Sequence, residues 1–133
     1  MPLTEREGVA GIALLAMYAD GVIMAEEDDL IRERLLQFPF FLELDEDALG
    51  RVLAAVEAHG EKVGPEKLLA ESAAAVGPRL RPTAYLLATE VVMADGDYAP
   101  EEDEYLQKLR KALALSDEQA RSIHEAVEIR ARR

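Results

Sequence analysis

Apolar residues recur along this chain at helical spacing, and turn residues separate the runs. The first run, from Glu5 to about Ala19, follows the capping box Thr4–Glu7 and is apolar nearly all round in its second half. Such a segment needs apolar neighbours on every side, so it predicts a central helix. Its longest apolar stretch is Val9 to Ala19. Because a membrane span takes roughly 18 or more such residues, no membrane insertion is expected.

The same periodicity predicts six further helices. Their expected spans are Glu26 to Gln37, Asp45 to near Gly60, Pro65 to Gly77, Pro82 to about Ala94, a helix from Pro100, and a last helix that opens at the capping box Ser116–Gln119 and frays at Arg130–Arg133. Phe38–Leu42 holds all three phenylalanines and is expected to close one end of the core. Val22-Ile23 is too short to count as a strand, so the predicted fold class is all-α.

An acidic turn motif occurs twice in the chain. Ala19-Asp20-Gly21 followed by Glu26-Glu27-Asp28 returns as Ala94-Asp95-Gly96 followed by Glu101-Glu102-Asp103, displaced by 75 positions. Leu44–Asp47 likewise resembles Leu115–Glu118, displaced by 71. The chain is therefore interpreted as a single domain, residues 1–133, with an internal repeat over about 4–58 and 80–130. The expected architecture is a compact bundle of about seven helices in two related helix–acidic turn–helix–helix halves, packed about a pseudo-twofold axis.

The acidic turns supply the candidate chemistry. If the halves pack symmetrically, Asp20, Glu27, Asp95 and Glu102 face one another, with Asp97, Glu26 and Glu101 as neighbours. Two carboxylates about 4 Å apart repel by about 4 kcal/mol at an effective dielectric constant near 20. Such a cluster either raises its pKa values or recruits a cation, and carboxylate oxygens suit Ca²⁺ or Mg²⁺.

The acidic turns have two other interpretations. Carboxylates in a first helical turn are favoured by the helix dipole, by about 0.3–1 kcal/mol each, without any ligand. An EF-hand is excluded, because the twelfth loop position is Ile31 or Leu106, where a bidentate Glu is required.

Charge and composition narrow the function classes. The formal net charge of −12 argues against nucleic acid as a partner and favours solubility, cation binding or a basic partner. The absence of Cys excludes disulfides and thiolate chemistry, and is compatible with the cytoplasm, where the protein is expected. His59 and His124 have no Ser or Cys giving a triad-like context, so no catalytic residue is assigned and no enzyme is expected.

An Ala-Asp-Gly turn followed by Glu-Glu, written twice in a small acidic helical chain, resembles the TerB-like family, named for tellurite resistance protein B. The resemblance covers nearly the whole chain. It implies about seven helices in two halves, acidic turns proposed to bind divalent cations, and a role in bacterial tellurite and stress response, often beside membrane-associated partners. Val22 departs from the family pattern, in which an acidic residue is common at this position.

Three functional hypotheses follow. The first is a non-enzymatic, cation-responsive module of a bacterial stress or tellurite-resistance system that binds Ca²⁺ or Mg²⁺ and contacts a protein partner. The second is a structural or scaffolding helical domain without a metal ligand, whose acidic surface serves solubility. The third, an enzyme that uses the carboxylates, requires an apolar pocket beside them.

Overall fold

The computed structural model describes residues 3–19, 32–33, 35–41, 44–93 and 100–131, and these residues form helices and connecting turns. The helices are α1 (Glu5–Met17), α3 (Glu46–Val63), α4 (Pro65–Ala75), α5 (Arg81–Val92), α6 (Pro100–Ala112) and α7 (Asp117–Ala131), with a short 3-10 helix η1 (Pro39–Phe41). No strand occurs in this described part, so the all-α prediction is confirmed. The predicted helix Glu26–Gln37 lies largely outside it, although residues 32–33 and 35–36 are helical.

Three helix starts carry the side-chain caps that the sequence predicts. At α1, the Glu7 amide donates to Thr4 Oγ1 at 3.1 Å, and the Thr4 amide donates to Glu7 Oε1 at 2.8 Å. Ser116 and Gln119 make the same reciprocal pair before α7, at 3.1 and 3.0 Å. Asp45 Oδ1 accepts from the Ala48 amide at 2.7 Å. Each cap satisfies amides that have no partner within the helix.

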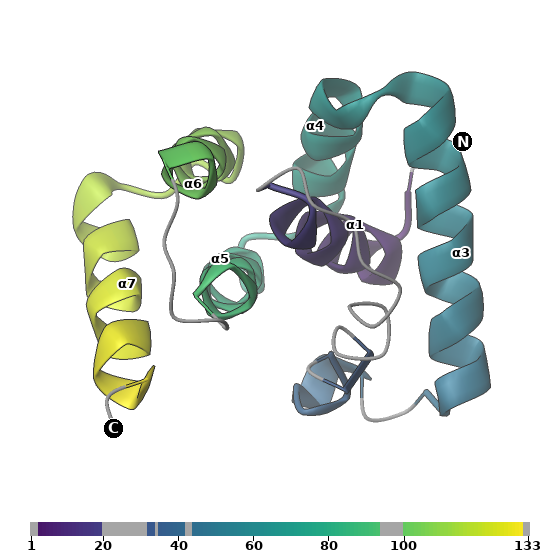
Figure 1. The fold of residues 1–133 in the computed structure, drawn as a ribbon, viewed down its shortest axis with the longest axis horizontal. Coiled ribbons are helices and arrows are strands. Elements are labelled where there is room, and N and C mark those ends of the chain that lie inside the picture. Colours follow the sequence, from purple (N-terminus) through teal and green to yellow (C-terminus); the bar gives the residue numbers. More distant parts are fainter. Residues whose placement is uncertain (1–2, 20–31, 34, 42–43, 94–99, 132–133) are drawn as a thin grey trace.

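The core is built around α1, as its apolar sequence predicts. Figure 1 shows α1 between α3 on one side and α5 and α6 on the other, with α4 above it. Every residue of α1 from Gly8 to Leu14 is buried, and so is Ala16. α7 packs against α5, at the end of the molecule opposite α3. Among the described helices, none combines the length and the hydrophobicity that crossing a membrane requires.

Two glycines of α1 let α4 approach closely. A Cβ on Gly8 would lie 2.7 Å from the carbonyl oxygen of Ser72, and a Cβ on Gly11 would lie 2.3 Å from Ser72 Oγ. Both distances are far below an ordinary van der Waals contact, so larger residues at these positions would push the helices apart. The periodicity of the sequence did not reveal this requirement.

The end of α3 corrects one prediction. The helix was expected to close near Gly60, but it continues to Val63. The turn falls at Gly64, whose φ of 91° favours glycine, immediately before Pro65 opens α4. Gly60 instead provides room for α4, because a Cβ there would lie 2.8 Å from Leu68 Cδ2.

Other helix boundaries differ from the predicted ones by one or two residues. α1 ends at Met17, α4 ends at Ala75, and α5 begins at Arg81 and ends at Val92. The last helix was expected to fray from Arg130, and it continues to Ala131.

The phenylalanine segment covers part of the core, as predicted. Phe41 in η1 is fully buried, and Phe38 and Phe40 pack against the core while half-buried. The rings of Phe40 and Phe41 meet edge to face, with centroids 5.2 Å apart.

The contacts among helices allow the predicted arrangement of halves. α1 packs against α3, α5 packs against α7, and α1 packs against α5 at the centre. The internal repeat and its twofold axis stay predictions, because both acidic turns lie largely outside the described residues.

Candidate functional site

The structure describes only part of the predicted acidic site. Asp20, Glu26, Glu27, Asp95 and Asp97 lie outside the described residues, whereas Glu101 and Glu102 lie in the first turn of α6. Within the described part of the chain, no three Asp, Glu or His side chains come close enough together to hold a metal ion. The predicted meeting of Asp20 with Asp95 therefore stays a prediction.

Glu101 and Glu102 occupy different environments. Successive side chains of a helix point about 100° apart, and here Glu101 is exposed while Glu102 is buried, with an exposed fraction of 6%. The helix dipole stabilises both carboxylates at this end of α6. Burying a carboxylate costs free energy unless polar groups compensate the charge. Glu102 therefore does not belong to the solvated acidic surface of the protein.

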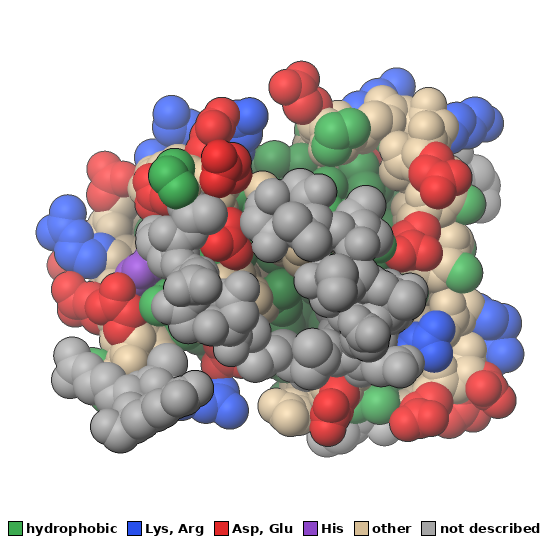
Figure 2. Space-filling view, viewed as in Figure 1, with side chains coloured by type: hydrophobic (Ala, Val, Ile, Leu, Met, Phe, Trp, Pro, Cys, Tyr) green, Lys and Arg blue, Asp and Glu red, His purple; other side chains and the backbone are tan. Residues whose placement is uncertain are grey.

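A pocket of about 330 Å³ lies where the C-terminal end of α1 meets α4 and α6. We call it the α1–α4–α6 pocket. It is lined by Leu15, Tyr18, Ala19, Pro65, Glu66, Leu69, Glu101, Glu104, Tyr105 and Lys108. In the face shown in Figure 2, hydrophobic side chains lie between α6 and α4, and carboxylates lie close by. Glu101 and Ala19, the residue that precedes Asp20 in the chain, both line this pocket.

Two tyrosine hydroxyls fix the walls of the pocket. Tyr105 on α6 donates to the carbonyl oxygen of Ile12 on α1 at 2.7 Å, and burial raises the pKa of Tyr105 well above its usual value. Tyr18, just after α1, donates to Glu57 Oε1 on α3 at 2.6 Å. The sequence predicts Tyr105 only as a member of an apolar stripe. Its hydrogen bond spans 93 positions, and no local signal could have revealed it.

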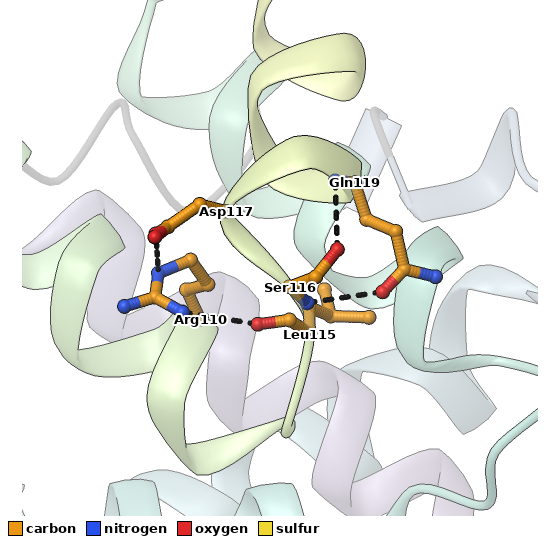
Figure 3. A network of polar contacts seen from close by, with 5 residues as sticks. All are labelled: Arg110, Leu115, Ser116, Asp117 and Gln119. Carbon is orange, nitrogen blue, oxygen red and sulfur yellow. Dashed lines mark hydrogen bonds and ion pairs between the residues drawn. The ribbon is translucent and has the colours of Figure 1, made fainter.

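Polar contacts join the end of α6 to the start of α7. Figure 3 shows Arg110 donating from Nη1 to the carbonyl oxygen of Leu115 at 3.0 Å, with its Nε 3.2 Å from Asp117 Oδ1. The capping pair of Ser116 and Gln119 lies beside them. The guanidinium therefore ties the last turn of α6 to the start of α7. Arg110, Ser116, Asp117 and Gln119 thus have a structural role in the connection between the two helices.

A pocket of about 390 Å³ adjoins this network, and Tyr85 forms part of its lining. Burial raises the pKa of Tyr85, while the nearby Arg110 opposes the rise and Asp103 adds to it. Basic and acidic side chains are mixed around this pocket, including Arg121, Glu125 and Asp117. Such a lining favours no ligand charge.

Both histidines contact carboxylates. His59 Nε2 lies 2.5 Å from Glu71 Oε2, which joins α3 to α4, and His124 Nε2 lies 3.1 Å from Glu128 Oε1 within α7. His59 was expected at a helix end, but α3 continues for one more turn. The contact with Glu71 gives His59 a structural role between two helices.

The comparison with protein families gives a match over most of the chain. The family model described as "Tellurite resistance protein TerB" matches residues 6–125, which is most of the 133-residue chain. No curated protein and no solved structure matches the chain. The matched range contains α3, α4, α5 and α6 in full, α1 except for Glu5, and both copies of the acidic turn. The chain belongs to the TerB family of tellurite resistance proteins.

Proposed function

We propose that this chain is a non-enzymatic, divalent-cation-binding interaction module of a bacterial stress or tellurite-resistance system. The observation that carries the proposal is the acidic turn written twice, with Asp20 and Asp95 at corresponding positions. Carboxylate oxygens are the ligands that Ca²⁺ and Mg²⁺ prefer. Membership of the TerB family supports the link with tellurite resistance.

The geometry around α6 supports this proposal in one respect. The α1–α4–α6 pocket joins Ala19, at the entry to the first acidic turn, with Glu101, at the exit from the second. The described carboxylates do not form a complete ligand set by themselves. The ligands would therefore come from Asp20, Glu26, Glu27, Asp95 and Asp97 together with Glu101 and Glu102. The cation would offset their mutual repulsion.

Calorimetric titration with CaCl₂ and with MgCl₂ tests the proposal. We expect binding to the unmodified protein, and at least about tenfold weaker binding when Asp20→Asn and Asp95→Asn are combined, because affinity depends on the number of charged ligands. The matched control combines Glu61→Gln and Glu118→Gln, which removes the same charge from exposed positions on α3 and α7. Equal affinity in the two double variants would exclude Asp20 and Asp95 as ligands.

A structural or scaffolding domain without a metal ligand is the second candidate. It is favoured by the placement of Glu66 and Glu101 in first helical turns, where the dipole alone stabilises carboxylates. It predicts no thermal shift with divalent cations. The cation-binding proposal instead predicts about 2.7 kcal/mol of added stability at a ligand concentration one hundred times the Kd.

A further inference from the structure

The α1–α4–α6 pocket has an apolar floor. Leu15, Leu69, Tyr18 and Tyr105 are half-buried and pack against the core, so part of each remains uncovered. The volume of about 330 Å³ lies at the lower end of the range of about 300–1,000 Å³ that ligand pockets occupy. A single bulky apolar side chain would gain favourable burial there.

The rim of this pocket is acidic. It carries Glu66, Glu101 and Glu104 against one cation, Lys108, whose Nζ lies 3.4 Å from Glu104 Oε1. Lys108 thus offsets one of three carboxylates and leaves a net of two negative charges. Within the described part of the chain, the carboxylates of Glu66 and Glu101 have no ion pair. The formal net charge of −12 over the whole chain has the same sign.

The floor and the rim contribute differently to binding. Glu66 and Glu101 lie in the first turns of α4 and α6, where the helix dipoles offset part of their charge. Exposed charges at the edge of an interface mainly set specificity and association rate. The apolar floor would therefore supply most of the affinity, and the carboxylates would select the charge of the ligand.

We propose that the α1–α4–α6 pocket docks a basic segment of a partner protein, with one bulky apolar side chain flanked by lysine or arginine. The apolar side chain enters the floor, the aliphatic stems of the flanking residues cover its edge, and their charged ends reach Glu66 and Glu101. An acidic segment would bring like charges together. This inference rests on the proposed role as an interaction module and names the chemistry of its partner.

The first test is an NMR titration of the isotope-labelled full chain with a synthetic peptide that carries one leucine between two pairs of lysines. We expect the largest amide shifts at Leu15, Leu69 and Tyr105. Two control peptides replace the leucine by serine or the lysines by glutamates, and both should bind at least about tenfold more weakly. Equal binding of the serine peptide, or shifts that cluster on α7, would overturn the proposal.

Variants on α4 then test the floor and the rim separately. Leu69→Gln should weaken the leucine peptide at least about tenfold, whereas Leu86→Gln, a half-buried control on α5 outside this pocket, should not. Glu66→Gln should weaken it about two- to fivefold and reduce its salt dependence, unlike the exposed control Glu61→Gln. A Glu66→Gln protein that binds as before, with the same salt dependence, would contradict the acidic rim.

The two proposals can fail separately. Neither Leu69 nor Glu66 belongs to the acidic turns, so calorimetry should find unchanged cation affinity in both variants. Peptide binding that is absent while cations still bind contradicts this inference alone. Cation binding that is absent while the peptide still binds contradicts the cation site alone. Sedimentation that shows a dimer dissociated by Leu69→Gln would mean that a second copy of the chain occupies the pocket, and would also overturn this inference.

Discussion

The contact between Gly11 and Ser72 allows a sharp test of how α1 meets α4. Ser72 is fully buried, and its Oγ has no hydrogen-bond partner in the described structure. A Cβ added at Gly11 would lie 2.3 Å from this oxygen, 3.3 Å from Ser72 Cβ and 3.4 Å from Val56 Cγ1. Only the contact with the oxygen is severe, so removing the oxygen should make room for the methyl group.

The expected free energies follow from these distances. Gly11→Ala should gain about 1 kcal/mol from helix propensity but lose about 2 kcal/mol to overpacking, for a net loss of about 1 kcal/mol. Ser72→Ala removes a buried hydroxyl without a partner and should gain about 1 kcal/mol. The double variant loses the clash and keeps both gains, so it should be about 2 kcal/mol more stable than the unmodified chain. The coupling between the two sites is then about 2 kcal/mol.

The assay is urea unfolding of the four proteins of this double-mutant cycle, followed by circular dichroism. Gly8→Ala is the control, because its Cβ would lie 2.7 Å from the Ser72 carbonyl oxygen and 2.9 Å from Ala75 Cβ. Ser72→Ala removes neither atom, so it should not rescue Gly8→Ala. If the free energies of Gly11→Ala and Ser72→Ala simply add, within about 0.5 kcal/mol, then α4 does not approach α1 as closely as described here.

Two further predictions concern a cap and a buried hydroxyl. Asp45→Ala removes the acceptor of the Ala48 amide and should lower the free energy of unfolding by about 1 kcal/mol in urea titrations. Asp47→Ala, two positions further along the chain and also exposed, should change it less. Because burial raises the pKa of Tyr105, the folded state holds this proton more tightly than the unfolded state. The contribution of Tyr105 to stability should therefore be fully present below pH 10 and be lost as the pH rises above it. Tyr105→Phe should make this alkaline loss of stability shallower. An identical alkaline pH profile in the two proteins would contradict the buried hydroxyl.

The sequence predicted those features of the fold that depend on local chemistry. The caps at Thr4, Asp45 and Ser116 are recognisable because the two bonded residues are three positions apart. The central position of α1 follows from its lack of a polar face. The sequence pattern also predicted helix starts at Pro65 and Pro100, where α4 and α6 begin.

Features that depend on how distant segments meet were not predictable. The end of α3 was assigned to Gly60, because two glycines in one region cannot be distinguished until the path of the chain is known. Gly64 makes the turn, and Gly60 makes room for Leu68. Likewise, Glu101 and Glu102 look alike in sequence, and only the packing of α6 decides that Glu102 is buried.

The position of the α1–α4–α6 pocket follows from the sizes of the side chains along the interface of α1 and α4. Near its N-terminal end α1 presents Gly8 and Gly11, and these meet Ser72 at close range in the second half of α4. Towards its C-terminal end α1 presents Leu15, which shares the pocket with Leu69 in the first half of α4. The two helices thus meet closely where the residues are small, and the pocket opens where the residues are large. This gradient of size places an apolar pocket at the C-terminal end of α1, where Ala19 lines it and precedes Asp20 in the chain.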